Sequence, residues 1–184
     1  MSEQNNLTPV EALASKNLID APITSYKIPR LADGKNDGQI TFGGLDPAKF
    51  DPTTIVTLNN LSRLGFWEAN MTTVFVSGRA LNITGRSAIL DTGTTLIIAP
   101  TADAQAVHGV IPGSKSDGQG GFTVPCKTMV TIELTFGGTA FAIDPRDLAI
   151  VPVNPAEPEG DCISGIAGGN IAGPNRWLVC QSYF

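Results

Sequence analysis

Short apolar runs, interrupted every few residues by glycine, proline or asparagine, extend over most of this chain. Alternating or continuous apolar runs of this length are typical of strands. Strands are predicted at 21–30, 39–44, 54–61, 66–78, 79–85 and 128–145. The turn-rich stretch 32–38 joins the first two into a hairpin, and Gly137-Gly138 places a second hairpin within the last segment.

Two segments have helical spacing instead. Residues 8–19 have apolar side chains near helical intervals, with Thr8 as N-cap and Glu11 completing a capping box. Residues 101–110 form the second candidate helix, with Ala102, Ala106 and Val107 expected on one side and Gly109 at its end. The pattern therefore predicts an all-β protein with two short helices.

One acidic residue interrupts the most apolar part of the chain. Ser87–Leu90 and Leu96–Ala99 are predicted strands, and the sequence Asp91-Thr92-Gly93-Thr94 lies between them. A carboxylate in apolar surroundings is costly unless it is hydrogen bonded, so Asp91 either caps a turn or takes part in chemistry. We expect it at the tip of a hairpin-like loop that opens into a cleft.

Composition narrows the function classes. The 184 residues suit one domain with a sizeable core, and 20 glycines and 13 prolines favour a strand-rich, loop-rich protein. A net charge of −5 without a basic cluster argues against a nucleic-acid partner. No apolar run approaches the roughly 20 residues that span a bilayer, and the polar start of the chain does not resemble a signal peptide. We therefore expect no membrane partner.

The cysteines suggest one disulfide. Cys126 and Cys162 lie in polar, turn-rich stretches, whereas Cys180 lies in the apolar sequence "WLVC". Pairing of Cys126 with Cys162, leaving Cys180 free, is the prediction. Glycosylation sequons at Asn6, Asn70 and Asn82 are consistent with a secreted glycoprotein.

Other candidate sites have weaker support. His108 is the only histidine, so a histidine-rich metal site or a Ser-His-Asp triad would have to rest on it alone, and a helix-end role is favoured. The sequence "GVIPGSKS" lacks the spacing and the Gly-Lys-Ser order of a phosphate loop. "CISGIAGGNIAG" is neither a nucleophile elbow nor a dinucleotide fingerprint.

The run "AILDTGTTLIIAP", residues 88–100, resembles the catalytic turn of the pepsin-like aspartic peptidases. Further segments resemble the C-terminal half of that family in the same order: "TPVEALASKNLI", "ITSYKI", "ITFGGLDPAKF", "FWEANM", "CISG" and "RWLV". The resemblance covers nearly the whole chain. It implies an initial helix and interdomain segment at residues 1–20, followed by an acid-protease C-terminal lobe at 21–184 whose closing strands are absent.

The resemblance also implies roles for the turn. Asp91 is one of two carboxylates that share a proton and activate a water molecule to hydrolyse a peptide bond, without a metal or cofactor. Gly93 lets the backbone approach the carboxylate and donates its amide to it. Thr92 locks two catalytic turns together, Thr94 donates to Asp91, and Thr95 faces a peptide or protein substrate. The expected location is secreted or vacuolar.

The chain departs from the family in two respects. Asp91 begins the only Asp-Thr-Gly sequence, and Cys180 stands where the family usually has glycine. Three interpretations are therefore open. The chain is the second lobe of an aspartic endopeptidase, inactive without the N-terminal lobe; a one-lobed peptidase that completes its site by homodimerisation; or a non-catalytic binding, effector or allergen-like protein.

Overall fold

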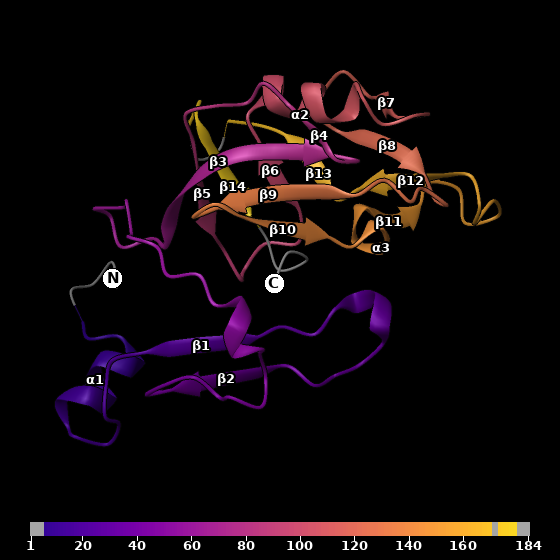
Figure 1. Ribbon diagram of the computed structural model, residues 1–184. Coiled ribbons are helices and arrows are strands. Elements are labelled where there is room, and N and C mark those ends of the chain that lie inside the picture. Colours follow the sequence, from indigo (N-terminus) through magenta and orange to yellow (C-terminus); the bar gives the residue numbers. More distant parts are fainter. Residues whose placement is uncertain (1–5, 171–172, 180–184) are drawn as a thin grey trace. The chain divides into compact units, whose positions relative to one another are not determined.

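The structure, a computed structural model, describes residues 6–170 and 173–179 and divides into two compact units (Figure 1). Within the described part, the first unit contains residues 6–55 and 63–65. The second unit contains residues 56–62, 66–170 and 173–179. The Asp-Thr-Gly turn belongs to the second unit.

The first unit is a helix followed by a two-stranded sheet. Its elements are α1 (Pro9–Ser15), β1 (Thr24–Lys27), the 3₁₀ turn η1 (Leu31–Asp33), β2 (Gln39–Phe42) and the 3₁₀ turn η2 (Pro52–Thr54). The predicted capping box is confirmed, because the Glu11 amide donates to Thr8 Oγ1 at 3.4 Å and the Thr8 amide donates to Glu11 Oε2 at 2.8 Å. β1 and β2 pair antiparallel, which confirms the first hairpin.

The strand predicted at 54–61 is absent from the structure. The Asn60 side chain provides the physical reason. Its amide nitrogen donates to the Phe66 carbonyl at 2.8 Å, and its oxygen accepts from the amides of Ser62 at 3.0 Å and Glu68 at 3.1 Å. An asparagine that binds nearby backbone in this way competes with a strand ladder and holds the segment as an irregular loop.

The second unit contains two sheets and two helices. Its elements are β3 (Glu68–Val76), β4 (Arg79–Ala80), β5 (Arg86–Leu90), β6 (Ile97–Ala99), α2 (Thr101–His108), β7 (Lys115–Ser116), β8 (Phe122–Pro125), β9 (Ile132–Phe136), β10 (Thr139–Ile143), α3 (Pro145–Leu148), β11 (Ala149–Pro152), β12 (Asp161–Ser164), β13 (Ile166–Gly168) and β14 (Arg176–Val179). The prediction of an all-β fold is confirmed. The four-residue helix α3 was not predicted, and only two residues of the segment 79–85 form a strand.

The larger sheet has the order β10-β9-β3-β5-β14-β6-β13, with β4 paired to β3. The predicted hairpin between 128 and 145 is β9–β10, and its turn residues Gly137 and Gly138 have φ values of 57° and 85°. Two consecutive positive φ angles are what a two-residue hairpin turn requires, and glycine adopts them without strain.

The strands on either side of Asp91 do not form the expected hairpin. β14 lies between β5 and β6, parallel to β5 and antiparallel to β6. The expectation of a hairpin-like loop was therefore wrong, because a strand from the far end of the chain takes the position where β6 would pair with β5. The Asp91 turn crosses the end of β14 instead of reversing onto its own strand.

The smaller sheet has the order β11-β12-β8-β7 and contains the predicted disulfide. Cys126 follows β8 and Cys162 lies within β12, with their Cα atoms 4.9 Å apart. The Cys126–Cys162 prediction is confirmed, whereas Cys180 lies outside the described residues. This bridge joins two neighbouring strands that are separated by 36 positions in the sequence.

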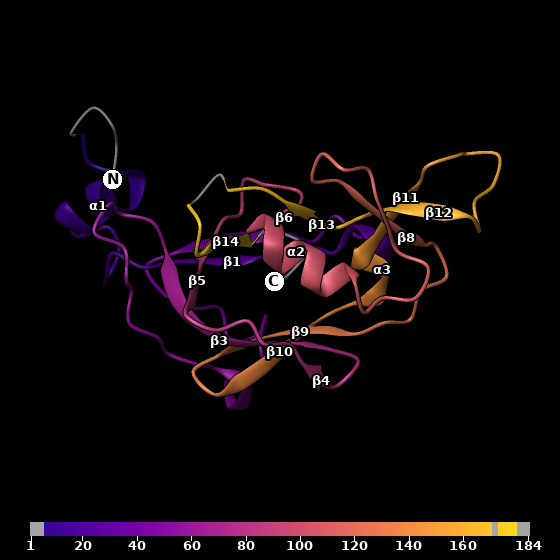
Figure 2. The same ribbon diagram turned by 90° about the horizontal axis from the view of Figure 1, so that it is seen from above.

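The buried face of α2 differs from the prediction. Ala102 and Ala106 are exposed, whereas Asp103, Val107 and His108 are buried. The helix packs beside β6 and β13 (Figure 2). An apolar pattern could not identify this face, because two of its residues are polar and are buried only through their hydrogen bonds.

Asp103 joins α2 to two strands of the larger sheet. It accepts from Arg86 Nε at 2.6 Å, from Arg86 Nη2 at 2.9 Å and from Trp177 Nε1 at 2.9 Å. Asp103 and Trp177 are only 3% and 0% exposed. The hydrogen bonds to Asp103 raise the pKa of Arg86, so the guanidinium stays charged beside this carboxylate.

A second buried carboxylate links three strands of the same sheet. Glu68 of β3 accepts from Ser87 Oγ of β5 at 2.6 Å and from Arg176 Nε of β14 at 2.9 Å. Successive residues of a strand point to opposite faces, so Arg86 and Ser87 engage the two carboxylates from opposite sides of β5. Side-chain hydrogen bonds therefore connect β5 and β14 on both faces of the larger sheet.

Replacing Asp103 tests how much this network contributes. Asp103→Ala would remove the acceptor of Arg86 Nε and Nη2 and of the buried Trp177 N–H, so we expect a loss of about 3–5 kcal/mol in the free energy of unfolding. Urea denaturation followed by circular dichroism measures it. Glu159→Ala, which removes the exposed ion pair between Lys127 and Glu159, is the control and should leave the unfolding curve almost unchanged. Equal effects of the two substitutions would contradict this assignment.

The disulfide gives a second prediction. Peptide mass spectrometry of the non-reduced protein should recover Cys126 joined to Cys162, with Cys180 open to alkylation after unfolding. Cys126→Ala together with Cys162→Ala should lower the free energy of unfolding by about 2–5 kcal/mol, because the unfolded chain loses a long-range constraint. A peptide that links Cys180 to either partner would refute the pairing.

Candidate functional site

Asp91 lies directly after the last residue of β5, where three strands meet. Its amide donates to the Val179 carbonyl of β14 at 2.9 Å. The preceding amide, that of Leu90, donates to the Trp67 carbonyl at 2.8 Å, just before β3 begins. Backbone hydrogen bonds to both neighbouring strands therefore fix the point at which the Asp91 turn leaves the sheet.

The turn itself orients the Asp91 carboxylate. The Gly93 amide donates to Asp91 Oδ1 at 2.8 Å, as the sequence predicted. A Cβ atom on Gly93 would lie 3.1 Å from the same oxygen, so the absence of a side chain permits this close approach. Asp91 is half-buried, and its Oδ2 accepts no hydrogen bond from any described residue. One carboxylate oxygen is held, and the other is left for a further interaction.

The three threonines of the turn have different environments. Thr92 and Thr94 are half-buried, and Thr95 is exposed. Thr94 Oγ1 is buried but makes no hydrogen bond within the described residues, so the expected bond to Asp91 is not formed. Thr94, one residue beyond Gly93, therefore has an unused hydrogen-bond donor. A buried hydroxyl without a partner costs free energy, which favours a hydrogen bond to a further group.

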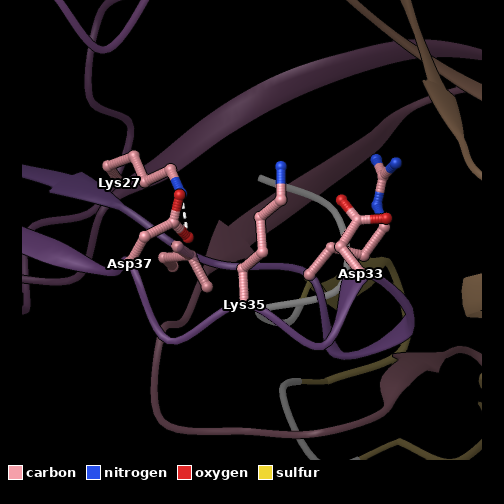
Figure 3. Close-up of a pocket in the computed structure, with 6 residues that line it drawn as sticks. Lys27, Asp33, Lys35 and Asp37 are labelled. Carbon is pink, nitrogen blue, oxygen red and sulfur yellow. Dashed lines mark ion pairs between the residues drawn. The ribbon is translucent and has the colours of Figure 1, made fainter.

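A charged pocket of about 270 Å³ lies in the first unit, in the connection between β1 and β2 (Figure 3). Lys27 and Asp37 form an ion pair in it, and Asp33 and Lys35 also line it. The hydrogen bond from Lys27 lowers the pKa of Asp37, so this carboxylate stays ionised. A lysine-paired aspartate is unsuited to sharing a proton with a second carboxylate.

His108 is the last residue of α2, which confirms its predicted place at a helix end. Both ring nitrogens are hydrogen bonded inside the protein, Nδ1 to the Ala104 carbonyl at 2.8 Å and Nε2 to Ser164 Oγ at 2.9 Å. No group of three or more His, Cys, Asp and Glu side chains placed to hold a metal occurs among residues 6–170 and 173–179. In the same part of the chain, every helix is too short or too polar to traverse a lipid bilayer.

Sequence reasoning missed the groups that support the site. Glu68 and Asp103, which fasten β5 to β14, were not identified, and neither was the Asn60 side chain that orders the backbone before β3. A buried carboxylate has no local signature, because its partners lie in distant segments. Asn60 could have been suspected, since asparagine is favoured in turns that bind their own backbone.

The family profile described as eukaryotic aspartyl protease matches residues 1–180. The chain belongs to this family. It is 38% identical over 173 residues to a probable aspartic-type endopeptidase CTSD from Arthroderma benhamiae, covering 94% of this chain and 33% of the relative. It is 30% identical to human cathepsin D, and the match covers 95% of this chain and 43% of cathepsin D. It is 28% identical to vacuolar protease A of Neurospora crassa, and the match covers 92% of this chain and 41% of that relative.

The chain thus spans between a third and a little under half of the length of these aspartyl protease relatives. These matches confirm the assignment to the pepsin-like family that the sequence resemblance implied. The relatives contain long segments that this chain does not match.

Replacing Gly93 tests how tightly the turn constrains Asp91. Gly93→Ala should displace the Asp91 carboxylate by a few tenths of an ångström, because the new Cβ would otherwise lie 3.1 Å from Oδ1. Crystal structures of the variant and the parent measure this shift. Gly44→Ala is the matched control, since a Cβ there meets nothing within 4 Å and should move no neighbour. An Asp91 carboxylate that stays in place in Gly93→Ala would show that the turn is looser than described.

Proposed function

We propose that this chain is the second lobe of a two-lobed aspartic endopeptidase and supplies one of the two catalytic carboxylates. Asp91 is the proposed catalytic residue. The observation that carries the proposal is its geometry: Gly93 fixes one carboxylate oxygen, and the other accepts no hydrogen bond within the described residues. A carboxylate held in this way is prepared to share a proton or bind a water molecule.

The reaction proposed for Asp91 needs a second carboxylate. Two carboxylates that face one water cannot both ionise cheaply, so one accepts a proton from the water while the other donates to the peptide carbonyl. Asp91 begins the only Asp-Thr-Gly sequence here, and the relatives are more than twice as long as the chain. We infer that the second carboxylate comes from an N-terminal lobe, and that the chain is inactive without it.

The threonines of the turn have proposed roles beside Asp91. The unused Thr94 hydroxyl is suited to donate to the second oxygen of the carboxylate once the site is assembled. Thr92 would join this turn to its counterpart in the other lobe. Thr95 is exposed and would face the substrate, a peptide held in extended form through main-chain hydrogen bonds.

A secreted or vacuolar location is proposed for the assembled protein. The Cys126–Cys162 disulfide supports it, because such bonds persist in oxidising compartments. The relative from Neurospora crassa is named a vacuolar protease. The sequons at Asn70 and Asn82 have exposed asparagines, which is compatible with glycosylation during secretion.

A chimera provides the direct test of activity. The chain replaces the matching 173-residue segment of the Arthroderma benhamiae relative, and cleavage of an unfolded protein is measured at acidic pH. We expect an active chimera whose Asp91→Asn variant loses at least about a thousandfold in rate, because the dyad loses its shared proton. Asp20→Asn, an exposed aspartate, is the matched control and should keep full activity.

The isolated chain distinguishes the remaining interpretations. Cleavage should stay at background over a concentration series of the chain alone. A rate that rises with the square of concentration and disappears in Asp91→Asn would identify a homodimeric peptidase instead. A chimera that folds but does not cleave would favour a non-catalytic binding or effector protein, and cleavage that survives Asp91→Asn would contradict every role proposed for Asp91.

A further inference from the structure

His108 is buried at the junction of three elements of the second unit. It ends α2 and is only 4% exposed. Its ring stacks on Phe122 of β8, with centroids 3.9 Å apart and planes 7° from parallel, and it hydrogen bonds Ser164 at the end of β12. One side chain therefore connects α2 to two strands of the smaller sheet.

The hydrogen bonds define the form of the ring. The Ala104 carbonyl 2.8 Å from Nδ1 can only accept, so Nδ1 carries a proton. In the neutral ring Nε2 is then an acceptor, and it receives the Ser164 hydroxyl at 2.9 Å. Ser164 Oγ in turn accepts from the Ile166 amide at 3.2 Å. The neutral ring satisfies every polar atom in this cluster.

We propose that His108 is an acid-sensitive latch, which holds α2 against β8 and β12 while the ring is neutral and releases them when the ring is protonated. A second proton would turn Nε2 into a donor. Ser164 Oγ would then have to accept from both His108 and Ile166, and its own hydroxyl hydrogen would lose its acceptor. Protonation thus breaks the pattern that the neutral ring completes.

No carboxylate among the described residues is hydrogen bonded to the His108 ring. On α2 itself, Asp103 is engaged by Arg86 and Trp177. On β12, Asp161 is paired with Lys115 of β7 at 2.5 Å. Neither these groups nor Asp147 of the adjoining α3 makes a hydrogen bond or ion pair with the ring within the described residues. The face of Phe122 attracts a cation weakly and offsets only part of the cost of burying the charge.

The direction of the pH effect follows from burial. Burial lowers the pKa of His108 below its ordinary value of 6.5, and the hydrogen bond to the Ala104 carbonyl offsets part of this shift. The unfolded chain therefore takes up the proton near pH 6.5, whereas the folded chain resists it. The stability that the neutral His108 ring contributes is fully present above pH 6.5 and is lost as the pH falls below it. The folding equilibrium constant then decreases by up to about tenfold per pH unit.

The latch adjoins the strand that follows the Asp91 turn. Gly165, next to Ser164, accepts from the Ile97 amide at the start of β6 at 2.9 Å. Release of the latch would loosen the support of β6 under acidic conditions. The inference concerns the folding of the second unit and does not depend on catalysis by Asp91.

Because His108 is the only histidine, a titration between pH 7 and 5.5 can be assigned to it. Urea unfolding of the full chain is measured across this range. We expect the folding constant of the parent to fall by about 3- to 8-fold, and that of His108→Gln, which keeps a donor and an acceptor but cannot ionise, to stay constant. The hydrogen-exchange protection factors of the amides in α2 and at Ser164 to Ile166 should fall towards low pH only in the parent.

A double variant serves as the matched control. His108→Gln combined with Gln105→His moves the single histidine to an exposed position of the same helix, and its folding constant should not depend on pH in this range. Persistence of the pH dependence in either variant would overturn the proposal. If the variants do not fold, proton NMR of the parent decides: a His108 resonance that titrates at or above pH 6.5 in the folded chain overturns the proposal, and one that titrates below supports it.

Discussion

Asp103 accepts hydrogen bonds from Arg86 of β5 and Trp177 of β14, the adjacent strands whose ends meet at the Asp91 turn. This interaction explains how a carboxylate can lie inside the core of the second unit. The carboxylate has a bidentate guanidinium partner and an indole donor, so its burial is compensated. On the opposite face, Glu68 connects the same two strands through Ser87 and Arg176. Together the two carboxylates fix β14 in the position that the Asp91 turn must cross.

The crossing connects the fold to the site. Because β14 lies between β5 and β6, the turn cannot collapse into a tight hairpin, and Asp91 stays at the end of the sheet with its amide bound to Val179. Gly93 then approaches the carboxylate closely enough to hold one of its oxygens. The chemistry proposed for the second oxygen thus depends on strand order as much as on the Asp-Thr-Gly sequence.

Asp103 and His108 are both buried on α2, but their hydrogen-bond partners suit different charge states. Asp103 is buried as an ion whose partners accompany it, whereas His108, five residues along the same helix, is buried as a neutral ring whose partners suit only that form. If both proposals hold, acid would favour the protonated carboxyl group of the proposed reaction and would weaken the packing of α2 against the smaller sheet.

Neighbouring residues determined much of the fold. The Thr8–Glu11 capping box, the Gly137-Gly138 hairpin, the Cys126–Cys162 pair and the apolar strands around Asp91 could all be predicted from the sequence, because each depends on local backbone preference or on recognisable motifs. The resemblance to the family rested on the Asp-Thr-Gly turn and on further segments in the same order, and the family profile matches residues 1–180.

Other features were decided only by tertiary structure. The insertion of β14, the buried positions of Asp103 and His108, and the irregular loop that replaces the strand predicted at 54–61 could not be predicted. A polar side chain is stable in the interior only if it finds partners. One partner of Asp103, Trp177, lies 74 positions away, and one partner of His108, Ser164, lies 56 positions away. Local sequence predicts which segments form strands and turns, whereas their order and the burial of charge depend on these long-range contacts.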